Sequence, residues 1–302
     1  MKKIILVAGA TGNLGLKITK ALLHKDAEIR AIVRSNSAIE KIKVLENLGV
    51  KIYKVSNWNL EELKTSCIDV SCVVSALSGM REVVIDAQKV LLDAAITAGV
   101  PRFIPSDYSL DFTKFLYGEN RNLDFRREFH EYLDQTSITA TSIFNGAFTE
   151  LLIDEMPMIL FKQKLILYWG NKDYKLGFTT MDNTAEFTAK VALESNTPRY
   201  LRIAGDLISP REVKLIVSEV TVQKFRLLRP GGQKLLSVII KIARKLAPGE
   251  KELYPAWQGM QYMHNMIDER SKIAKLDNNR YPEIHWTTVK EVLFKNQDEI
   301  NK

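Results

Sequence analysis

Short apolar runs recur along the first half of the chain, and stretches with helical spacing separate most of them. The runs cover residues 4–8, 28–33, 50–55, 70–76, 101–105 and 138–144. Strands that alternate with helices in this way build a mostly parallel sheet with right-handed crossovers and helices on both faces. The pattern therefore predicts an α/β fold with a doubly wound parallel sheet, in which ligands bind at the carboxyl ends of the strands.

The rhythm changes after about residue 150. The turn residues Gly170-Asn171 predict a hairpin there. We expect residues 1–150 to form the domain with the parallel sheet and residues 151–302 to build a second, smaller lobe. Segment 179–208, which contains a predicted helix and a predicted strand, is expected to pack back onto the first domain.

The first apolar run, Ile4 to Ala8, leads directly into glycines at positions 9, 12 and 15 and then into helical spacing. Glycines at such a turn let backbone N–H groups approach a pyrophosphate at the helix N-terminus, where the helix dipole favours negative charge. A purely structural turn is the alternative. We favour a dinucleotide site of the Rossmann type, formed by Gly9, Thr11, Gly12, Asn13, Leu14 and Gly15.

The end of the second strand indicates which dinucleotide binds. Arg34 stands about twenty residues after the glycine turn, where NAD-binding sites place a carboxylate for the ribose 2′-hydroxyl. A guanidinium can instead hold the 2′-phosphate of NADP, so the sequence predicts NADP as the cofactor. Ser35 and Lys41 are close enough in sequence to add contacts, although Lys41 could equally lie on the solvated face of a helix at 38–48.

The carboxyl ends of three later strands supply further cofactor candidates. In a parallel sheet these ends lie at the same edge as the glycine turn. We therefore predict cofactor contacts from Ser75, Ala76, Pro105, Ser106 and Asn145.

Composition restricts the class of protein. A chain of 302 residues with 46% hydrophobic content can bury a large core. Cys67 and Cys72 are too few for a disulfide scaffold and lack metal-ligand spacing, which points to buried thiols in a reducing compartment. The N-terminal apolar run is too short for a secretory signal, and no stretch reaches the eighteen or so apolar residues of a membrane span. We expect a cytoplasmic protein.

The net charge of +7 is concentrated in one segment, because residues 211–252 alone carry +6. Within it, residues 234–247 have the pattern of a basic amphipathic helix. Such a helix can lie on an anionic membrane or contact nucleic acid. We favour a packed helix with one solvated edge, because most of its circumference is apolar. We expect no nucleic-acid partner, because no aromatic-interleaved basic groove accompanies the helix.

Several motifs together resemble one family. They are the glycine turn, Arg34, Arg102-Phe103-Ile104-Pro105-Ser106-Asp107-Tyr108, Asn145-Gly146-Ala147-Phe148, the stretch from Phe178 to Lys190, and Tyr281 to Val289. Over nearly its whole length the chain resembles the NmrA-like and isoflavone-reductase-like branch of the atypical short-chain dehydrogenase/reductases. The resemblance implies an NADP-binding Rossmann domain, a smaller C-terminal substrate lobe, and reduction of small aromatic or conjugated substrates.

The catalytic position departs from that family. Its reductases carry a lysine in a Phe-Asp-x-Lys stretch after the fifth strand, and the matching residues here are Leu123-Asp124-Phe125-Arg126. A guanidinium stays protonated and cannot act as general acid or base, but it can stabilise a developing oxyanion. We predict that Arg126 is catalytic. The alternative is a helix-surface arginine paired with Asp124 or Glu128.

Other catalytic patterns are weaker. His130 follows Arg126 by one helical turn and Tyr108 follows the fifth strand, so both are catalytic candidates, although packing explains each more simply. Tyr168 and Lys172 match the Tyr-x-x-x-Lys spacing of typical short-chain dehydrogenases, but that pair must lie on a helix and here spans the predicted hairpin. The four histidines are scattered and predict no metal site.

These observations favour an NADPH-dependent oxidoreductase that reduces a small apolar substrate, aromatic, quinone or enone in type. Hydride addition to a quinone or enone leaves a delocalised anion that a guanidinium can stabilise without donating a proton. The stretch 254–267, rich in aromatic residues and methionine, fits a core or an adaptable apolar pocket. The alternative is a non-catalytic NADP-binding regulator that senses redox state and binds a protein partner. A homodimer is compatible with either function.

Overall fold

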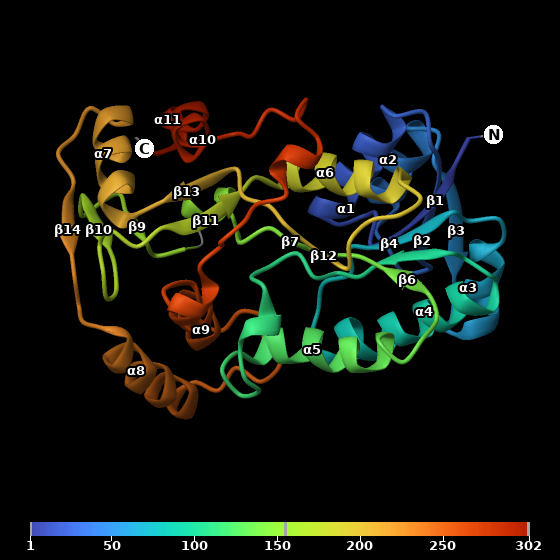
Figure 1. Cartoon of the computed structure of the whole chain (residues 1–302), viewed down its shortest axis with the longest axis horizontal. Coiled ribbons are helices and arrows are strands. Elements are labelled where there is room, and N and C mark those ends of the chain that lie inside the picture. Colours follow the sequence, from blue (N-terminus) through green and yellow to red (C-terminus); the bar gives the residue numbers. More distant parts are fainter. Residues whose placement is uncertain (1, 154–155, 301–302) are drawn as a thin grey trace. The chain divides into compact units, whose positions relative to one another are not determined.

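The six apolar runs of the first half form one parallel sheet in the computed structural model, which describes residues 2–153 and 156–300 (Figure 1). The strand order is β3-β2-β1-β4-β5-β6, and every neighbouring pair is parallel. The strands are β1 (Ile4–Ala8), β2 (Glu28–Arg34), β3 (Lys51–Val55), β4 (Cys72–Ser75), β5 (Arg102–Ile104) and β6 (Thr139–Ala140). The doubly wound α/β fold is thus confirmed. Its strand order reverses between β1 and β4, where such sheets bind ligands.

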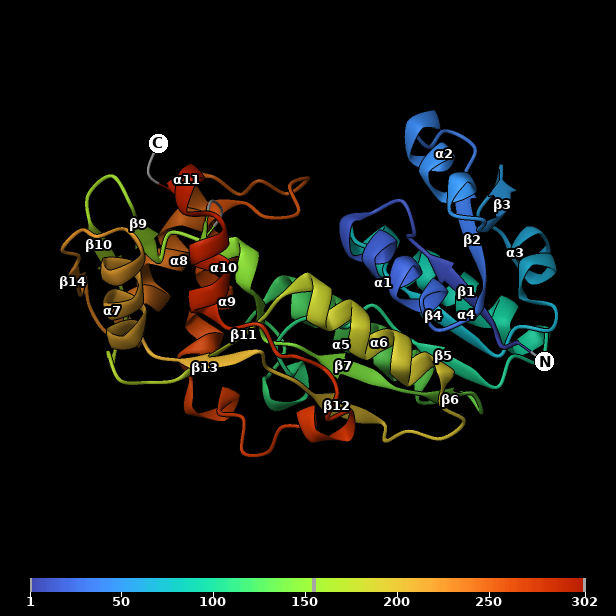
Figure 2. The same cartoon turned by 90° about the horizontal axis from the view of Figure 1, so that it is seen from above.

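Helices cover both faces of this sheet (Figures 1 and 2). The helices α3 (Leu60–Cys67), α4 (Gln88–Thr97) and α5 (Arg121–Leu133) pack on one face through buried side chains such as Leu63, Leu91 and Phe129. The opposite face carries α1 (Asn13–Leu23) and α6 (Met181–Leu193), and α2 (Ile39–Asn47) follows β2. The buried Arg102 of β5 links the sheet to α6, because its guanidinium donates a hydrogen bond to the carbonyl of Val191 in that helix over 2.7 Å.

The second half of the chain forms two small sheets with their own helices and core. One sheet contains β9 (Ile159–Leu160), β10 (Leu165–Leu167) and β14 (Arg226–Leu228), and the other contains β8 (Ala147–Phe148), β11 (Leu176–Thr179) and β13 (Asp206–Ile208). The helices are α7 (Pro210–Val220), α8 (Gln233–Leu246), α9 (Ala256–Met266), α10 (Val289–Lys295) and α11 (Gln297–Ile300). Phe178, Val213, Met266 and Val289 lie in the core of this part.

The chain divides into two compact units, each built from three segments. The first unit comprises residues 1–108, 125–143 and 184–201, and the second comprises residues 109–124, 144–183 and 202–302. The strands β7 (Ser142–Phe144) and β12 (Tyr200–Arg202) pair with each other where the chain passes from one unit to the other. The chain therefore passes between the two units more than once, rather than at a single boundary near residue 150.

Two expectations for the second half are wrong. No hairpin surrounds Gly170 in the described residues, because β10 pairs with β9 and β14 whereas β11 pairs with β8 and β13. Gly170 has a positive φ of 68°, so the turn signal is real, but the turn joins strands of different sheets. The helix at 234–247 was expected to be packed around most of its circumference. In α8, Leu236 and Ile240 are buried, but several other aliphatic residues are exposed, so less of the helix is packed than expected.

Among the described residues, no helix combines the length and apolar character that crossing a membrane requires. Cys67 and Cys72 are both buried free thiols, as expected for two cysteines without metal-ligand spacing. Burial raises the pKa of the Cys67 thiol to about 11, so this side chain is a packing element rather than a nucleophile.

Candidate functional site

The glycine turn between β1 and α1 is packed too closely for side chains at two of its positions. Gly9 has a positive φ of 84°, and a Cβ added there would lie 2.5 Å from the carbonyl oxygen of Ala76. A Cβ at Gly15 would lie 2.1 Å from the carbonyl oxygen of Gly9. These two glycines therefore keep the turn tight and bring the N-terminus of α1 close to the end of β1.

Gly12 differs, because the described residues around it would need to shift only slightly to admit a side chain. Its φ of −83° suits any residue, it is exposed, and an added Cβ would meet only the carbonyl oxygen of Gly9, at 3.3 Å. Gly12 is also the N-cap residue directly before α1, whose first N–H groups have no partner within the helix. The missing side chain leaves space for an anion at the helix N-terminus, where Thr11, Asn13 and Leu14 also lie.

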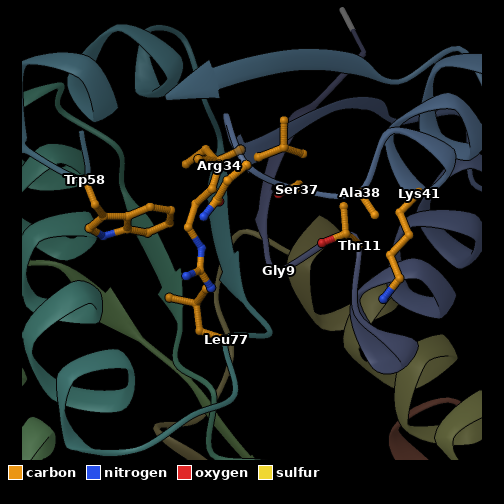
Figure 3. Close-up of a pocket in the computed structure, with 11 residues that line it drawn as sticks. Gly9, Thr11, Arg34, Ser37, Ala38, Lys41, Trp58 and Leu77 are labelled. Carbon is orange, nitrogen blue, oxygen red and sulfur yellow. The ribbon is translucent and has the colours of Figure 1, made fainter. Parts of the chain in front are cut away.

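A pocket of about 280 Å³ lies beside this turn (Figure 3). Its lining includes Gly9 and Thr11 from the turn, Arg34 from the end of β2, and Lys41 from α2. Figure 3 shows the Arg34 side chain between Trp58 on one side and Thr11 and Lys41 on the other. The lining contains two cations and no carboxylate, so the pocket attracts anionic groups such as phosphate.

The lining also includes residues that no local sequence pattern marks as binding residues. Trp58 enters the pocket from the connection between β3 and α3, and its indole N–H donates to the carbonyl of Ala87 over 2.7 Å. Asn36 and Ser37 line the pocket from the connection between β2 and α2. The predicted Ser35 is not among the lining residues, because its hydroxyl donates to the carbonyl of Val55 over 2.9 Å.

The two predicted cofactor residues at the end of β4, Ser75 and Ala76, lie next to the end of β1, where the glycine turn begins. Ala76 donates its N–H to the carbonyl of Ala8 over 2.8 Å, and its own carbonyl faces Gly9. Ser75 is fully buried, and its hydroxyl has no hydrogen-bond partner among the described residues. Leu77, the next residue of this connection, lines the pocket.

The residues after β5 tie the strand end to α5. Ser106, which follows the buried Pro105, donates its hydroxyl to the carbonyl of Leu77 over 2.7 Å. The carbonyl of Ser106 accepts a hydrogen bond from Nε of Arg126 over 3.2 Å. Arg126 is half-buried, so α5 holds a permanent positive charge at the carboxyl end of β5.

His130 is part of a buried network rather than an exposed proton donor. Its Nε2 lies 2.6 Å from Oδ2 of Asp107, and its Nδ1 lies 3.1 Å from a guanidinium nitrogen of Arg199. A guanidinium can only donate, so Nδ1 accepts, and Nε2 carries the proton that it donates to Asp107. Burial alone would raise the pKa of the Asp107 carboxyl, but the interactions with His130, Ser142 and Arg126 outweigh burial and hold this pKa below its usual value.

Tyr108, the third catalytic candidate, is also buried. Burial raises the pKa of its phenol above the usual value, because the phenolate would lose its hydration. The structure therefore brings Arg126, Asp107 and His130 together at the end of β5, but it gives neither Tyr108 nor His130 the exposure of a proton donor.

Asn145 lies in the second unit, with its backbone fixed and its side chain unsatisfied. Its N–H donates to the carbonyl of Ser109 over 3.1 Å, and its carbonyl accepts a hydrogen bond from the Thr179 hydroxyl over 2.6 Å. The side chain is fully buried, and neither of its polar atoms has a partner among the described residues. Leaving such groups unpaired costs about 1–3 kcal/mol each, which indicates that a ligand or a water completes this site.

The network around Asp107 makes stability depend on pH. Asp107→Asn is expected to lower the free energy of unfolding by about 2 kcal/mol at pH 7, because it replaces the charged acceptor of the His130 hydrogen bond by a neutral amide. A carboxyl whose pKa is lower in the folded than in the unfolded protein stabilises the fold at pH values above its unfolded pKa of about 3.9. This stabilisation is lost as the pH falls through the folded pKa. The difference between variant and native protein should therefore shrink in urea titrations below pH 4. A difference that does not change with pH would contradict this role, and the exposed Asp86→Asn is the control.

Gly12→Val tests the phosphate role of the turn. The fold should persist, because the neighbouring Gly9 carbonyl needs to move only a few tenths of an ångström. The valine side chain would occupy the space left for the pyrophosphate, so NADPH affinity should fall at least tenfold. Calorimetry measures this affinity, and Gly259→Val in α9 is the matched control because an added Cβ there meets nothing within 4 Å. Normal NADPH binding by a folded Gly12→Val protein would exclude the turn from phosphate binding.

Comparison with known proteins places these features in a family. Pinoresinol reductase 1 of Arabidopsis thaliana is 28% identical over 282 residues, which cover 89% of this chain and 87% of that protein. The solved structure of AtPrR2 with NADP+ and (+)pinoresinol matches with a TM-score of 0.83 and 22% identity, over 98% of this chain and 99% of that chain. A crystal structure of isoflavone reductase matches with a TM-score of 0.80 and 18% identity, over 98% and 99% of the two chains. The sequence pattern of the NmrA-like family matches residues 1–292, and the chain therefore belongs to the NmrA-like family.

Proposed function

We propose that this chain is an NADPH-dependent reductase of a small apolar substrate, aromatic, quinone or enone in type. The observation that carries the proposal is the pocket beside the glycine turn, which contains Arg34 and Lys41 and no carboxylate. The similarity to a protein solved with NADP+ and (+)pinoresinol supports both the cofactor and an aromatic substrate.

The residues present fit this cofactor in two respects. The space at Gly12 suits the pyrophosphate, which the first N–H groups of α1 would hold. Arg34 and Lys41 would hold the 2′-phosphate, and Trp58 and Leu77 would supply apolar walls beside it. When bound, NADPH supplies the hydride.

Arg126 would provide the electrostatic part of the reaction. Its hydrogen bond to the Ser106 carbonyl fixes the guanidinium, which pre-organises a positive charge for an anion that develops on the substrate. His130 would act as a positioning residue, because it holds Asp107, whose carboxylate interacts with the charge of Arg126. With no exposed donor at Tyr108 or His130, solvent would supply the proton, which suits quinones and enones because hydride addition to them gives stabilised anions.

A turnover screen tests the proposal. The purified chain would be mixed with NADPH or NADH and with a panel that contains a quinone, an enone and pinoresinol, and cofactor oxidation would be recorded. We expect oxidation of NADPH with at least one member of the panel, at a rate at least tenfold above that with NADH. Binding of NADPH without turnover on any member would contradict reductase activity and favour a redox-sensing regulator.

A further inference from the structure

The helix α8 carries a second apolar face that is largely exposed. Four of its aliphatic side chains are between 45% and 79% exposed: Leu235, Val238, Ile242 and Leu246. We call these four residues the α8 stripe. Their spacing of three or four residues places them along one side of the helix. Leu236 and Ile240, which are buried, lie on a different side, so the stripe is not the face that packs on the second unit.

A row of lysines runs beside the α8 stripe. Lys234, Lys241 and Lys245 are exposed, and each directly precedes a residue of the stripe. Successive helix residues differ by about 100° in direction, so the lysine row flanks the stripe along the whole helix. Between Thr221 and Gly249 the chain has seven lysines and arginines and no aspartate or glutamate. The α8 stripe therefore lies in a segment whose charged side chains are all positive.

We propose that α8 docks this protein on an anionic lipid surface. A helix of this kind lies in the plane of the interface, with its apolar stripe among the acyl chains and its basic row against the headgroup phosphates. Lysines at the border of the apolar face suit this position, because their aliphatic stems stay in the apolar zone while the ammonium groups reach the phosphates. The inference goes beyond the proposed reductase activity and is independent of it.

The charge distribution favours a lipid surface over two other occupants. A second copy of the chain, docked symmetrically, would bring two segments with seven cations each together, and four side chains cover little of the roughly 800 Å² per partner of a standard interface. Nucleic acid would be attracted by the lysines, but its phosphate backbone makes no contact that would bury an aliphatic stripe. An anionic surface with an apolar interior matches both the α8 stripe and the lysine row.

Vesicle sedimentation with the full chain tests the proposal. The native protein is expected to bind phosphatidylcholine vesicles with 30% phosphatidylglycerol at least tenfold more tightly than pure phosphatidylcholine vesicles, and to lose part of this binding in high salt. The variant Ile242→Ser/Leu246→Ser keeps every charge and should lose at least tenfold in affinity. The variant Lys234→Glu/Lys241→Glu/Lys245→Glu should lose more. The control Lys20→Glu/Lys43→Glu/Lys54→Glu makes the same charge change on exposed lysines outside α8 and should bind far better than the α8 lysine variant.

Four outcomes would overturn the proposal. The first is a native protein that ignores anionic vesicles. The second is retention of full binding by the serine variant, which would reduce the interaction to surface charge alone. The third is a native dimer that the serine variant converts to a monomer without lipid, which would assign the stripe to a second copy. The fourth is binding of duplex DNA, but not of vesicles, through the α8 lysines.

Discussion

Replacing Arg126 by alanine is expected to slow hydride transfer to a quinone by about 10²-fold, in the range of a lost oxyanion partner, while NADPH affinity stays nearly unchanged. The reason is that Arg126 places a fixed guanidinium at the end of β5 and takes no part in the pocket beside the glycine turn. Stopped-flow measurement of NADPH oxidation under single-turnover conditions reports this step directly. Arg126→Lys should retain part of the rate and add activity on substrates that need a proton.

Arg127→Ala is the matched control, because it removes the same type of side chain from the next position of α5. Its hydride-transfer rate should stay within a factor of about two of the native rate. An unchanged quinone rate in Arg126→Ala would exclude Arg126 from the site, and Tyr108 and His130 would then be the residues to test.

Arg34→Asp is expected to weaken NADPH binding by about 10²-fold, because it removes a charge-assisted hydrogen-bond donor and places a carboxylate against the 2′-phosphate. NADH lacks that phosphate, so its affinity should stay the same or improve. Calorimetry with both cofactors gives the two dissociation constants. Lys43→Asp makes the same change of charge on α2 outside the pocket lining and should leave both constants nearly unchanged. Equal affinities of the native protein for NADPH and NADH would refute the role given to Arg34.

The parallel sheet and its glycine turn could be predicted because their signals are local. β1 and β4 are buried on both faces and therefore read as apolar runs, and in β2 the buried Arg30 is the one charged residue between apolar neighbours. Gly9 is required by a contact with Ala76 after β4, and Gly15 by a contact with Gly9. Arg34 was predictable for the same reason, since its place at the end of β2 follows from the position of the strand.

The rest depended on contacts between distant segments. Trp58 reaches the pocket from the connection after β3, and nothing in its neighbourhood in sequence marks it as a binding residue. The turn at Gly170 was recognised, but which strands pair on either side of it depends on β8, β9, β13 and β14. His130 was identified as a candidate, but its engagement by Asp107 and Arg199 requires the fold to bring three segments together.

The most direct test of the proposed activity is label transfer from NADPH. The purified chain would be incubated with NADPH deuterated at C4, in separate experiments for the two faces of the nicotinamide, and with the quinone or enone that supports turnover. We expect that one of the two labelled cofactors delivers deuterium and that the other delivers protium. Mass spectrometry of the enone product and an isotope effect on the quinone rate report the transfer. NADPH that binds with the affinity expected from Arg34, yet transfers neither isotope to any substrate of the panel, would contradict it.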